Sequence, residues 1–242
     1  MDRWTLYEYC VQSPRDACDL LGCAHGSSPR RLLEDFAGSA AIAREWTRRG
    51  GEALALDLDP EALGWAGDSV RTLVADAARP LALEDGTFDV VHAGNFSLGY
   101  LQERATLLAY LRERRRVLAS GGVLVCDTYG GRSAFELGAW DRERFLEGGV
   151  RVVSTWEHRR ADPVTALVEN VLHFRVERGG ELVARHPDAF TYRWRLWSLP
   201  ELRDLALEAG FRACDVFPDA SGPLAPGAEL EPDFSVAVVA RA

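Results

Sequence analysis

Three acidic side chains, Glu34, Asp57 and Asp76, each follow an apolar segment with the composition of a buried parallel strand. Parallel strands bring their carboxyl ends to one edge of a sheet, where open α/β sheets bind their ligands. An acid about 20 residues after the first turn can accept both hydroxyls of a ribose. The acid one strand further suits the amino group of an adenine, and Glu34 suits a cationic amino group. The three acids therefore predict a pocket for an adenosine that carries an amino group.

Each acid also has a structural interpretation that the sequence leaves open. Glu34 could be a buried acid satisfied by backbone amides. Asp57 could cap the helix that follows it, and Asp76 could pair with Arg79. The order of the three acids along the chain favours ligand binding.

A short turn, Phe36-Ala37-Gly38-Ser39, joins Glu34 to a predicted helix. Its glycine lets the backbone approach a ligand closely. The turn lacks the Gly-x-Gly-x-x-Gly pattern that accommodates a pyrophosphate, and the chain contains no lysine for a Gly-x-x-x-x-Gly-Lys phosphate cradle. These absences disfavour a dinucleotide. S-adenosylmethionine, in contrast, combines an adenosine with an α-amino acid tail.

Five segments in chain order resemble the motifs of class I S-adenosylmethionine-dependent methyltransferases, over residues 30–130. The first segment departs from the usual motif because a glutamate replaces the usual aspartate and only one of the usual glycines remains. Together with the segment from Tyr192 to Leu202, this motif resembles a bacterial subgroup of the family. The five segments are Glu34–Ala40 (first motif), Leu56–Pro60 (ribose motif), Val74–Ala77 (adenine motif), Phe88–Ser97 (fourth motif) and Arg116–Gly122 (the turn before the fifth strand).

The resemblance implies S-adenosylmethionine as cofactor and a role for each matching position. Glu34 and Gly38 would hold its methionine moiety, Asp57 its ribose, and Asp76 with Ala77 its adenine. Two residues after the fourth strand would line the floor beneath it, although the first of them could simply form a turn. The complete set of expected cofactor-binding residues is Glu34, Phe36, Ala37, Gly38, Ser39, Asp57, Leu58, Asp76, Ala77, Asn95 and Phe96.

Methyl transfer to nitrogen or oxygen is a direct displacement on a carbon that the sulfonium already activates, so alignment and exclusion of water matter most. A base can help an oxygen nucleophile, whereas a neutral amine needs none. The absence of an obvious catalytic motif is therefore expected, and the sequence identifies no catalytic residue. An acidic protein with a local cap suits a small-molecule acceptor better than a nucleic acid. Aromatic faces attract a sulfonium or an ammonium, although aromatic residues at strand spacing are more often core residues. The aromatic residues expected to contact the acceptor are Tyr7, Tyr100, Tyr129, Tyr192 and Trp194.

Two other functions remain compatible with these residues. One is a nicotinamide-dependent dehydrogenase that uses the turn at Gly38, against which the missing glycines count. The other is a module that binds S-adenosylmethionine without turnover, because a fold does not guarantee activity. Binding of S-adenosylmethionine and of its demethylated product, measured by calorimetry, separates the three functions.

Strands and helices alternate five times between residues 31 and 127, which predicts a doubly wound, mostly parallel seven-stranded α/β sheet of the Rossmann-like methyltransferase type. After residue 150, polar and apolar residues alternate, which predicts an antiparallel β-meander of three strands inserted after the fifth strand. This meander is expected to cover the open side of the pocket.

Ser198 and Glu201 predict a capping box for the last helix. The expected domains are 1–149 (N-terminal segment and core), 150–197 (antiparallel cap) and 198–242 (C-terminal helix and closing strands). The expected strands are 31–34, 53–57, 71–76, 88–93 and 122–127, then 150–157, 167–177, 182–196, 211–217 and 234–240.

The composition narrows the class of protein further. The formal net charge of −9 argues against nucleic-acid binding, and the one arginine-rich cluster, Arg112–Arg116, is interpreted as the solvated face of a helix. No apolar run approaches the roughly 18 residues of a membrane span, and the N-terminus does not have the pattern of a signal peptide. Five scattered cysteines indicate reduced thiols and no metal site. We therefore expect a cytoplasmic protein without membrane or nucleic-acid partners, and a homodimer is compatible with the sequence.

Overall fold

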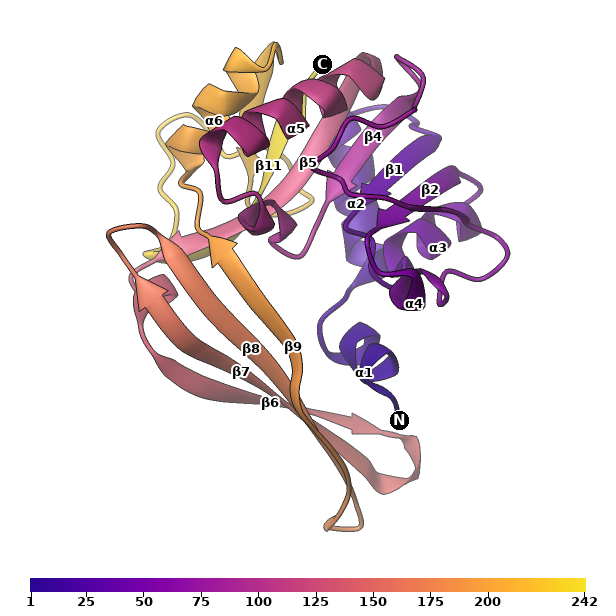
Figure 1. Cartoon of the computed structure of the whole chain (residues 1–242), viewed down its shortest axis with the longest axis vertical. Coiled ribbons are helices and arrows are strands. Elements are labelled where there is room, and N and C mark those ends of the chain that lie inside the picture. The colour runs from indigo at the N-terminus through magenta and orange to yellow at the C-terminus, as the bar shows by residue number, and fades with distance from the viewer. The chain divides into compact units, whose positions relative to one another are not determined.

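The computed structural model describes all 242 residues, and the chain folds as two compact units (Figure 1). The parallel-sheet unit consists of Ser13–Gly131 and Trp197–Ala242. The antiparallel-sheet unit consists of Met1–Gln12 and Arg132–Leu196. The expected grouping of residues 1–149 differs from this division at both ends, because the first helix packs on the antiparallel sheet and that sheet starts before residue 150.

Seven strands of the parallel-sheet unit form one sheet in the order β10-β11-β5-β4-β1-β2-β3. Strands β1 to β5 run parallel, whereas β11 is antiparallel to both of its neighbours. The direction in which successive strands are added reverses between β1 and β4, and sheets of this kind bind ligands at that switch point. The predicted fold class is confirmed. The strands are β1 (Arg31–Asp35), β2 (Glu52–Asp57), β3 (Arg71–Val74), β4 (Phe88–Ala93), β5 (Leu118–Gly131), β10 (Ala213–Phe217) and β11 (Asp233–Arg241).

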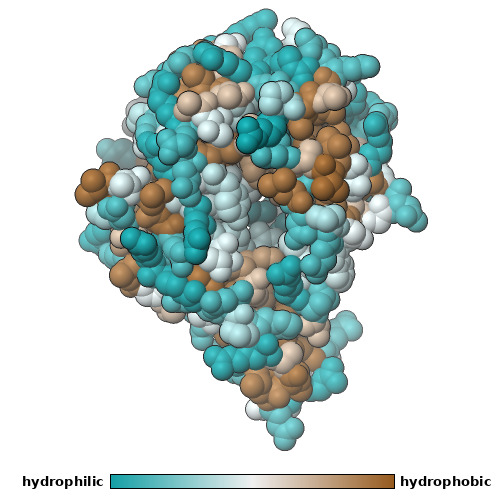
Figure 2. Space-filling model, in the orientation of Figure 1, coloured by the Kyte–Doolittle hydropathy of each residue, from teal (hydrophilic) through white to brown (hydrophobic).

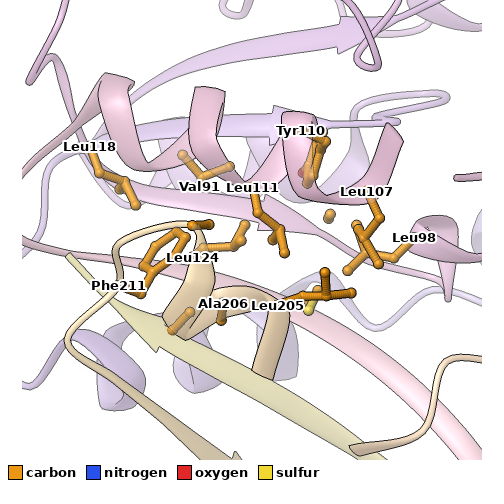
Figure 3. Packing of buried hydrophobic residues seen from close by; sticks show 14 of the residues in the cluster. Val91, Leu98, Leu107, Tyr110, Leu111, Leu118, Leu124, Leu205, Ala206 and Phe211 are labelled. Carbon is orange, nitrogen blue, oxygen red and sulfur yellow. The ribbon is translucent and has the colours of Figure 1, made fainter. Parts of the chain in front are cut away.

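Helices cover both faces of this sheet. Successive residues of a strand point to opposite faces, so Leu32 belongs to one buried apolar cluster and Leu33 to the other. Figure 3 shows the cluster of Leu33, in which Leu107 and Leu111 of one helix approach Leu205 of another. Burial on both faces explains why the strands are apolar runs rather than alternating patterns. Helices α2 (Pro14–His25), α3 (Ala41–Arg48) and α4 (Pro60–Leu63) cover one face, and α5 (Arg104–Val117) and α6 (Leu199–Glu208) cover the other.

Local signals in the sequence set several helix ends. The predicted capping box is present at α6, where Ser198 Oγ accepts from the Glu201 amide and the Glu201 side chain accepts from the Ser198 amide. Asp59 caps α4, and Pro60 occupies its first turn. Gly26, with φ of 78°, ends α2 in the left-handed conformation that glycine adopts without strain.

The antiparallel sheet has four strands in the order β6-β7-β8-β9, one more than predicted. The additional strand, β6, lies at the edge of the sheet, and its central residues Asp141–Arg144 are all charged and exposed. Charged side chains are common on edge strands because they discourage pairing with another chain. Because all four of these residues are charged, the segment lacks the alternation of polar and apolar residues that would have predicted a strand. The elements of this unit are α1 (Arg3–Cys10), β6 (Gly138–Leu146), β7 (Val150–Asp162), β8 (Leu167–Arg178) and β9 (Glu181–Arg195).

One face of the antiparallel sheet is aromatic. The ring of Phe190 on β9 packs against Trp4 and Tyr7 of α1, with ring centroids 5.0 and 4.9 Å apart. These contacts explain why the first residues of the chain belong to this unit. Tyr192 and Trp194 continue along β9 with centroids 4.6 Å apart. The aromatic row is the set Trp4, Tyr7, Trp156, Phe190, Tyr192 and Trp194.

In the view of Figure 2, hydrophilic side chains cover much of the surface and apolar side chains form several separate groups, one of them over the hairpin ends of the antiparallel sheet. The exposed apolar residues of those strand ends include Phe145, Leu182 and Val183. None of the helices combines the length and the apolar composition that crossing a membrane requires.

Candidate active site

Glu34 lies at the end of β1 and is almost fully buried. Its Oε2 accepts a hydrogen bond of 2.8 Å from the amide of Ala43, in the first turn of α3. The N-cap residue of that helix, Ala40, provides no side-chain cap. Glu34 therefore satisfies from a neighbouring strand an amide that a capping residue would satisfy locally. Burial raises the pKa of Glu34 to about 8, although the Ala43 amide favours the ionised form. Such a carboxyl group is mostly neutral at pH 7 and ionises when a cation approaches.

The loop after β1 contains one glycine but has three left-handed residues. Phe36, Gly38 and Ala40 have φ values of 53°, 53° and 57°. A left-handed residue other than glycine costs on the order of 1–3 kcal/mol, so its surroundings must hold it. The amide of Ala37 donates to the carbonyl of Leu56 at 2.9 Å, and the amide of Ala40 donates to the carbonyl of Ala37 at 2.8 Å. Although the loop lacks the usual glycines, its backbone keeps the left-handed conformation that glycine would adopt without strain.

Ser39 in this loop is fully buried, and its Oγ has no hydrogen-bond partner within the chain. Most buried hydroxyls in native proteins have a partner, and each exception requires an explanation. A ligand that approaches the loop beside Gly38 would supply one.

Asp57 connects the loops that follow β1 and β2. Its Oδ2 accepts from the amide of Gly38 at 2.7 Å, and its Oδ1 accepts from the amide of Asp59 at 2.9 Å. The cap of α4 is Asp59, which excludes Asp57 from that structural role. An ionised carboxylate has about four lone-pair positions, so both oxygens of Asp57 can still accept hydroxyl groups. Leu58 beside it is 65% exposed and provides an apolar surface at the rim of the site.

Asp76 follows β3, and its Oδ1 accepts from the amide of Ala78 at 2.8 Å. Its ion pair with Arg79 is long, 3.6 Å between Nε and Oδ2, and the arginine side chain is mostly exposed. Pairs of this kind contribute little, so the pair leaves the Asp76 carboxylate available to a ligand. Ala77 is buried, and its carbonyl accepts from Nη2 of Arg114 at 3.1 Å.

Arg114 corrects one sequence interpretation. It belongs to the arginine-rich cluster that was predicted to be solvated, but it is fully buried under the sheet and forms an ion pair with Asp35 at the end of β1. The hydroxyl of Tyr110 donates to the same carboxylate at 2.7 Å. Neither Asp35 nor Arg114 was predicted to be a functional or core residue, because a cluster of arginines does not reveal which of them faces the core. Helical spacing from Tyr110 and Leu107, both buried, is the signal that could have identified it.

Asn95 and Phe96 form a strained turn after β4, with φ values of 55° and 60°. Both amides donate to the carboxylate of Asp127 on β5, Asn95 to Oδ2 at 2.9 Å and Phe96 to Oδ1 at 2.6 Å. Burial raises the pKa of Asp127 to about 6, against the effect of these two amides, so the carboxylate is ionised at pH 7. Asp127 was predicted to end the fifth strand but was given no role. That predicted position, like those of Asp57 and Asp76, was the available signal, although β5 continues to Gly131 in the structure.

The five aromatic residues predicted to contact the acceptor belong to different units. In the parallel-sheet unit, Tyr129 of β5 packs on Phe96 with centroids 4.7 Å apart, and Tyr100 stacks on Phe36 with centroids 6.3 Å apart. Both tyrosines therefore lie beside the loops described above. Tyr7, Tyr192 and Trp194 are buried members of the aromatic row in the antiparallel-sheet unit.

Residues 35–126, which include these four loops, match the family model of the methyltransferase domain. The strand order and the switch point between β1 and β4 agree with that match. The matched residues form a methyltransferase domain within the parallel-sheet unit, which has the Rossmann-like methyltransferase fold. No curated protein matches the sequence.

Solved structures of methyltransferases share the fold across nearly the whole chain. A structure of an S-adenosylmethionine-dependent methyltransferase from Clostridium acetobutylicum has a TM-score of 0.74 at 15% identity and covers 98% of this chain and 96% of its own. An amino pentose methyltransferase from Micromonospora echinaspora has a TM-score of 0.71 at 20% identity, covering 98% and 94%. A sugar N-methyltransferase from Streptoalloteichus has a TM-score of 0.72 at 16% identity, covering 98% and 92%.

The residues of the methyltransferase domain fit the cofactor of this family. The unpartnered Ser39 hydroxyl and the Oε1 atom of Glu34, which the Ala43 amide leaves unused, are polar positions in the first loop. The carboxylates of Asp57 and Asp76 stand at the ends of the next two strands, each with lone pairs to spare. This donor and acceptor set suits an amino acid joined to an adenosine.

Proposed function

We propose that this protein transfers a methyl group from S-adenosylmethionine to a small-molecule acceptor by direct displacement, with a nitrogen or oxygen atom as nucleophile. The observation that carries the proposal is the series of acids and strained turns at the carboxyl ends of β1 to β4 in a methyltransferase domain. When bound, S-adenosylmethionine supplies a methyl group that its positive sulfur has already activated.

Each of the three acids binds a different part of the cofactor. Glu34 ionises against the amino group of the methionine moiety, because a nearby cation favours the charged form of a carboxyl group. Asp57 accepts the ribose hydroxyls with the lone pairs that Gly38 and Asp59 leave unused. Asp76 accepts from the adenine amino group, beside the buried backbone of Ala77. The remaining predicted residues of these loops, from Phe36 to Ser39 with Leu58, form the walls of the same site.

A nitrogen nucleophile suits the residues near the β4 turn better than an oxygen nucleophile does. The carboxylate of Asp127 is engaged by two backbone amides. His92 is buried beneath the turn, where burial lowers its pKa to about 4, so it is a weak base. A neutral amine needs no base in the displacement step, whereas a hydroxyl benefits from one. The amino pentose and sugar N-methyltransferases among the similar structures act on nitrogen according to their names, which supports an amino sugar or a comparable polar amine as acceptor.

Two tyrosines add a second element to the proposal. Faces of aromatic rings attract cations and cover apolar ligand surface. We propose that Tyr100 and Tyr129, which pack on Phe36 and Phe96 beside the loops of the methyltransferase domain, bind the acceptor. The role expected for Tyr7, Tyr192 and Trp194 stays a prediction.

Calorimetry and methyl transfer test this function in two steps. Titration of the protein with S-adenosylmethionine, with S-adenosylhomocysteine and with NADPH establishes which cofactor binds. Isotope-labelled S-adenosylmethionine is then offered with pairs of acceptors that differ in one atom, an amino sugar and its hydroxyl parent. We expect both adenosyl compounds to bind, NADPH not to bind, and label to appear on the amino member of a pair.

The other outcomes discriminate the alternatives. Transfer to the hydroxyl member alone assigns an oxygen nucleophile. Binding of both adenosyl compounds without transfer to any acceptor favours a binding module that has lost turnover. Binding of NADPH without binding of S-adenosylmethionine overturns the proposal in favour of a dehydrogenase.

A further inference from the structure

The turn after β4 contains two consecutive left-handed residues, Asn95 and Phe96, neither of which is glycine. Single left-handed asparagines are tolerated, but a neighbouring left-handed phenylalanine is a strained position that must be held by its surroundings. The residue before them must be glycine, because a Cβ on Gly94 would lie 2.5 Å from Cε1 of the His92 ring. The conformation of this turn is therefore imposed by its neighbours.

The neighbour that imposes it is Asp127. The parallel register aligns Ala93 with Cys126, so Asp127 comes level with the start of the turn on the adjacent strand. Each of its carboxylate oxygens accepts one amide, Oδ2 from Asn95 at 2.9 Å and Oδ1 from Phe96 at 2.6 Å. Hydrogen bonds from amides to an ionised carboxylate are shorter and stronger than those between neutral groups. One side chain thus fixes both strained residues at once.

Two further contacts join β5 to the same turn. Tyr129, two residues after Asp127, places its ring edge-on against the ring of Phe96 with centroids 4.7 Å apart. Thr128 donates to the carbonyl of Trp197, whose indole nitrogen donates to the carbonyl of Leu101 beyond the turn. The turn is held at its backbone by Asp127, at its ring by Tyr129, and at its far end through Trp197.

We propose that Asp127 is a positioning residue for methyl transfer, which holds the Asn95–Phe96 turn in its left-handed conformation so that the turn supports the methyl-bearing end of S-adenosylmethionine. The inference rests on the proposed function, because it assigns that turn to the floor of the cofactor site. Asp127 acts through the backbone of its neighbours. Each of its oxygens accepts one of these amides, and the proposal assigns the contact with the ligand to the turn.

The substitution Asp127→Asn tests this role because it keeps the size of the side chain but turns one oxygen into an NH₂ group, which cannot accept from an amide. The readout is calorimetric affinity for S-adenosylmethionine and S-adenosylhomocysteine, which differ only in the methyl group and the charge on sulfur. We expect the Kd for S-adenosylmethionine to rise about tenfold. The Kd for S-adenosylhomocysteine should rise less than about threefold, because it lacks the group that the turn supports.

Asp89→Asn is the matched control. Asp89 also accepts two backbone amides, those of Arg30 and Arg31, both at 2.9 Å, but at the opposite, amino end of β1. This variant should lower the unfolding midpoint and leave the affinities for both adenosyl compounds unchanged. A general loss of stability would change binding in both variants alike, whereas a positioning role changes it only in Asp127→Asn.

A double-mutant cycle with Phe96→Gly, at the strained position, separates strain from direct electrostatics. Glycine adopts the left-handed conformation without strain, so Asp127→Asn should weaken binding of S-adenosylmethionine by less than about threefold in the Phe96→Gly background. An equal loss in both backgrounds would assign the effect to the charge of Asp127 and overturn the positioning role. The same role is overturned if Asp127→Asn weakens both adenosyl compounds equally, or neither.

Two results keep failure of this inference distinct from failure of the proposed function. If the unmodified protein binds neither adenosyl compound, the proposed function fails. If it binds them and Asp127→Asn binds them equally well, only the positioning role fails. Should Asp127→Asn alone not fold, folding and cofactor binding by the Phe96→Gly/Asp127→Asn variant support the role of strain, and failure of both variants to fold refutes it.

Discussion

The two sheets of this protein use acidic side chains in different ways. In the methyltransferase domain, acids on the strands or just after them accept hydrogen bonds from the backbone amides of loops and of the first turn of α3, and these acids are at least partly buried. In the antiparallel-sheet unit, acids pair with arginines on the exposed face of the strands. The acid–amide pairs are Glu34–Ala43, Asp57–Gly38, Asp76–Ala78 and Asp127–Asn95, and the ion pairs are Glu143–Arg151, Glu177–Arg151, Glu157–Arg159 and Asp188–Arg159.

This difference predicts at which acidic residues the loss of one charge will affect cofactor binding or stability. An acid that accepts from a backbone amide sets the position of that backbone, and salt screens a partly buried bond of this kind much less than an exposed one. An ion pair between two exposed side chains contributes little, because both ends remain hydrated and mobile. Substitutions in the methyltransferase domain should therefore alter cofactor binding or stability strongly, and those on the charged face of the antiparallel sheet should alter neither.

The largest effect is expected at the one ion pair of the methyltransferase domain that is fully buried, Asp35–Arg114. Arg114→Met leaves the Asp35 carboxylate buried without its partner, and breaking such a pair costs about 3–5 kcal/mol of unfolding free energy. Urea denaturation followed by circular dichroism measures it. The double variant Asp35→Leu/Arg114→Met should recover most of the loss, because two apolar side chains replace the pair. A single-variant loss below about 1 kcal/mol would place this pair with the exposed ones.

The next effect is expected at Asp57, the acid assigned to the ribose. Asp57→Ala removes two charge-assisted hydrogen bonds to hydroxyls, so the Kd for S-adenosylhomocysteine should rise on the order of 100-fold. Isothermal titration calorimetry measures it.

Asp59→Ala is the control for Asp57, because Asp59 lies two residues away but caps α4. Loss of this cap should cost about 1 kcal/mol of stability and leave the affinity unchanged. Similar affinities for the two variants would contradict the assignment of the ribose to Asp57.

Glu34 predicts a pH dependence. Its pKa of about 8 in the folded protein lies above the ordinary value of 4.5, so its contribution to stability is complete below pH 4.5 and is lost as pH rises through 8. Binding of the cofactor's amino group requires the ionised form. The affinity of the unmodified protein for S-adenosylhomocysteine should therefore increase from pH 6 to pH 8 and then level off.

Glu34→Gln keeps an acceptor for the Ala43 amide but has no charge to titrate. Its affinity should be flat over this range and about tenfold weaker than that of the unmodified protein at pH 8. At pH 9 its midpoint of thermal unfolding should also be higher than that of the unmodified protein, because the variant never carries the buried charge. Parallel pH profiles for the two proteins would show that Glu34 does not meet the amino group.

The parallel sheet could be predicted from the sequence because each of its signals is local. Apolar runs, glycine and proline at helix ends, and the capping box of Ser198 and Glu201 fix the elements without knowledge of their neighbours. The acids at strand ends followed from the same periodicity. Strand β6 could not be predicted, because edge strands are recognised by their partners and its charged centre has no alternation.

The missed parts of the site depend on pairing between distant segments. Asp127 and the turn at Asn95 are 32 residues apart, and Arg114 and Asp35 are 79 residues apart. Only the register of neighbouring strands, or the buried face of α5, brings them together. The acids of the site were thus predictable as positions, whereas the amides to which they bind were not.

The smallest effect is expected on the charged face of the antiparallel sheet. Arg159 pairs with Glu157 and with Asp188, and all three side chains are about one third exposed or more. Arg159→Gln removes both pairs, yet the midpoint of thermal unfolding should shift by less than about 2 °C, because exposed ion pairs contribute little. The shift should become smaller still in 1 M salt, which screens exposed charges within about 3 Å. Cofactor affinity should stay unchanged. A shift as large as that of Arg114→Met would mean that these pairs act as one cooperative network. The acids of the two sheets would then differ in their partners but not in how much they stabilise the fold.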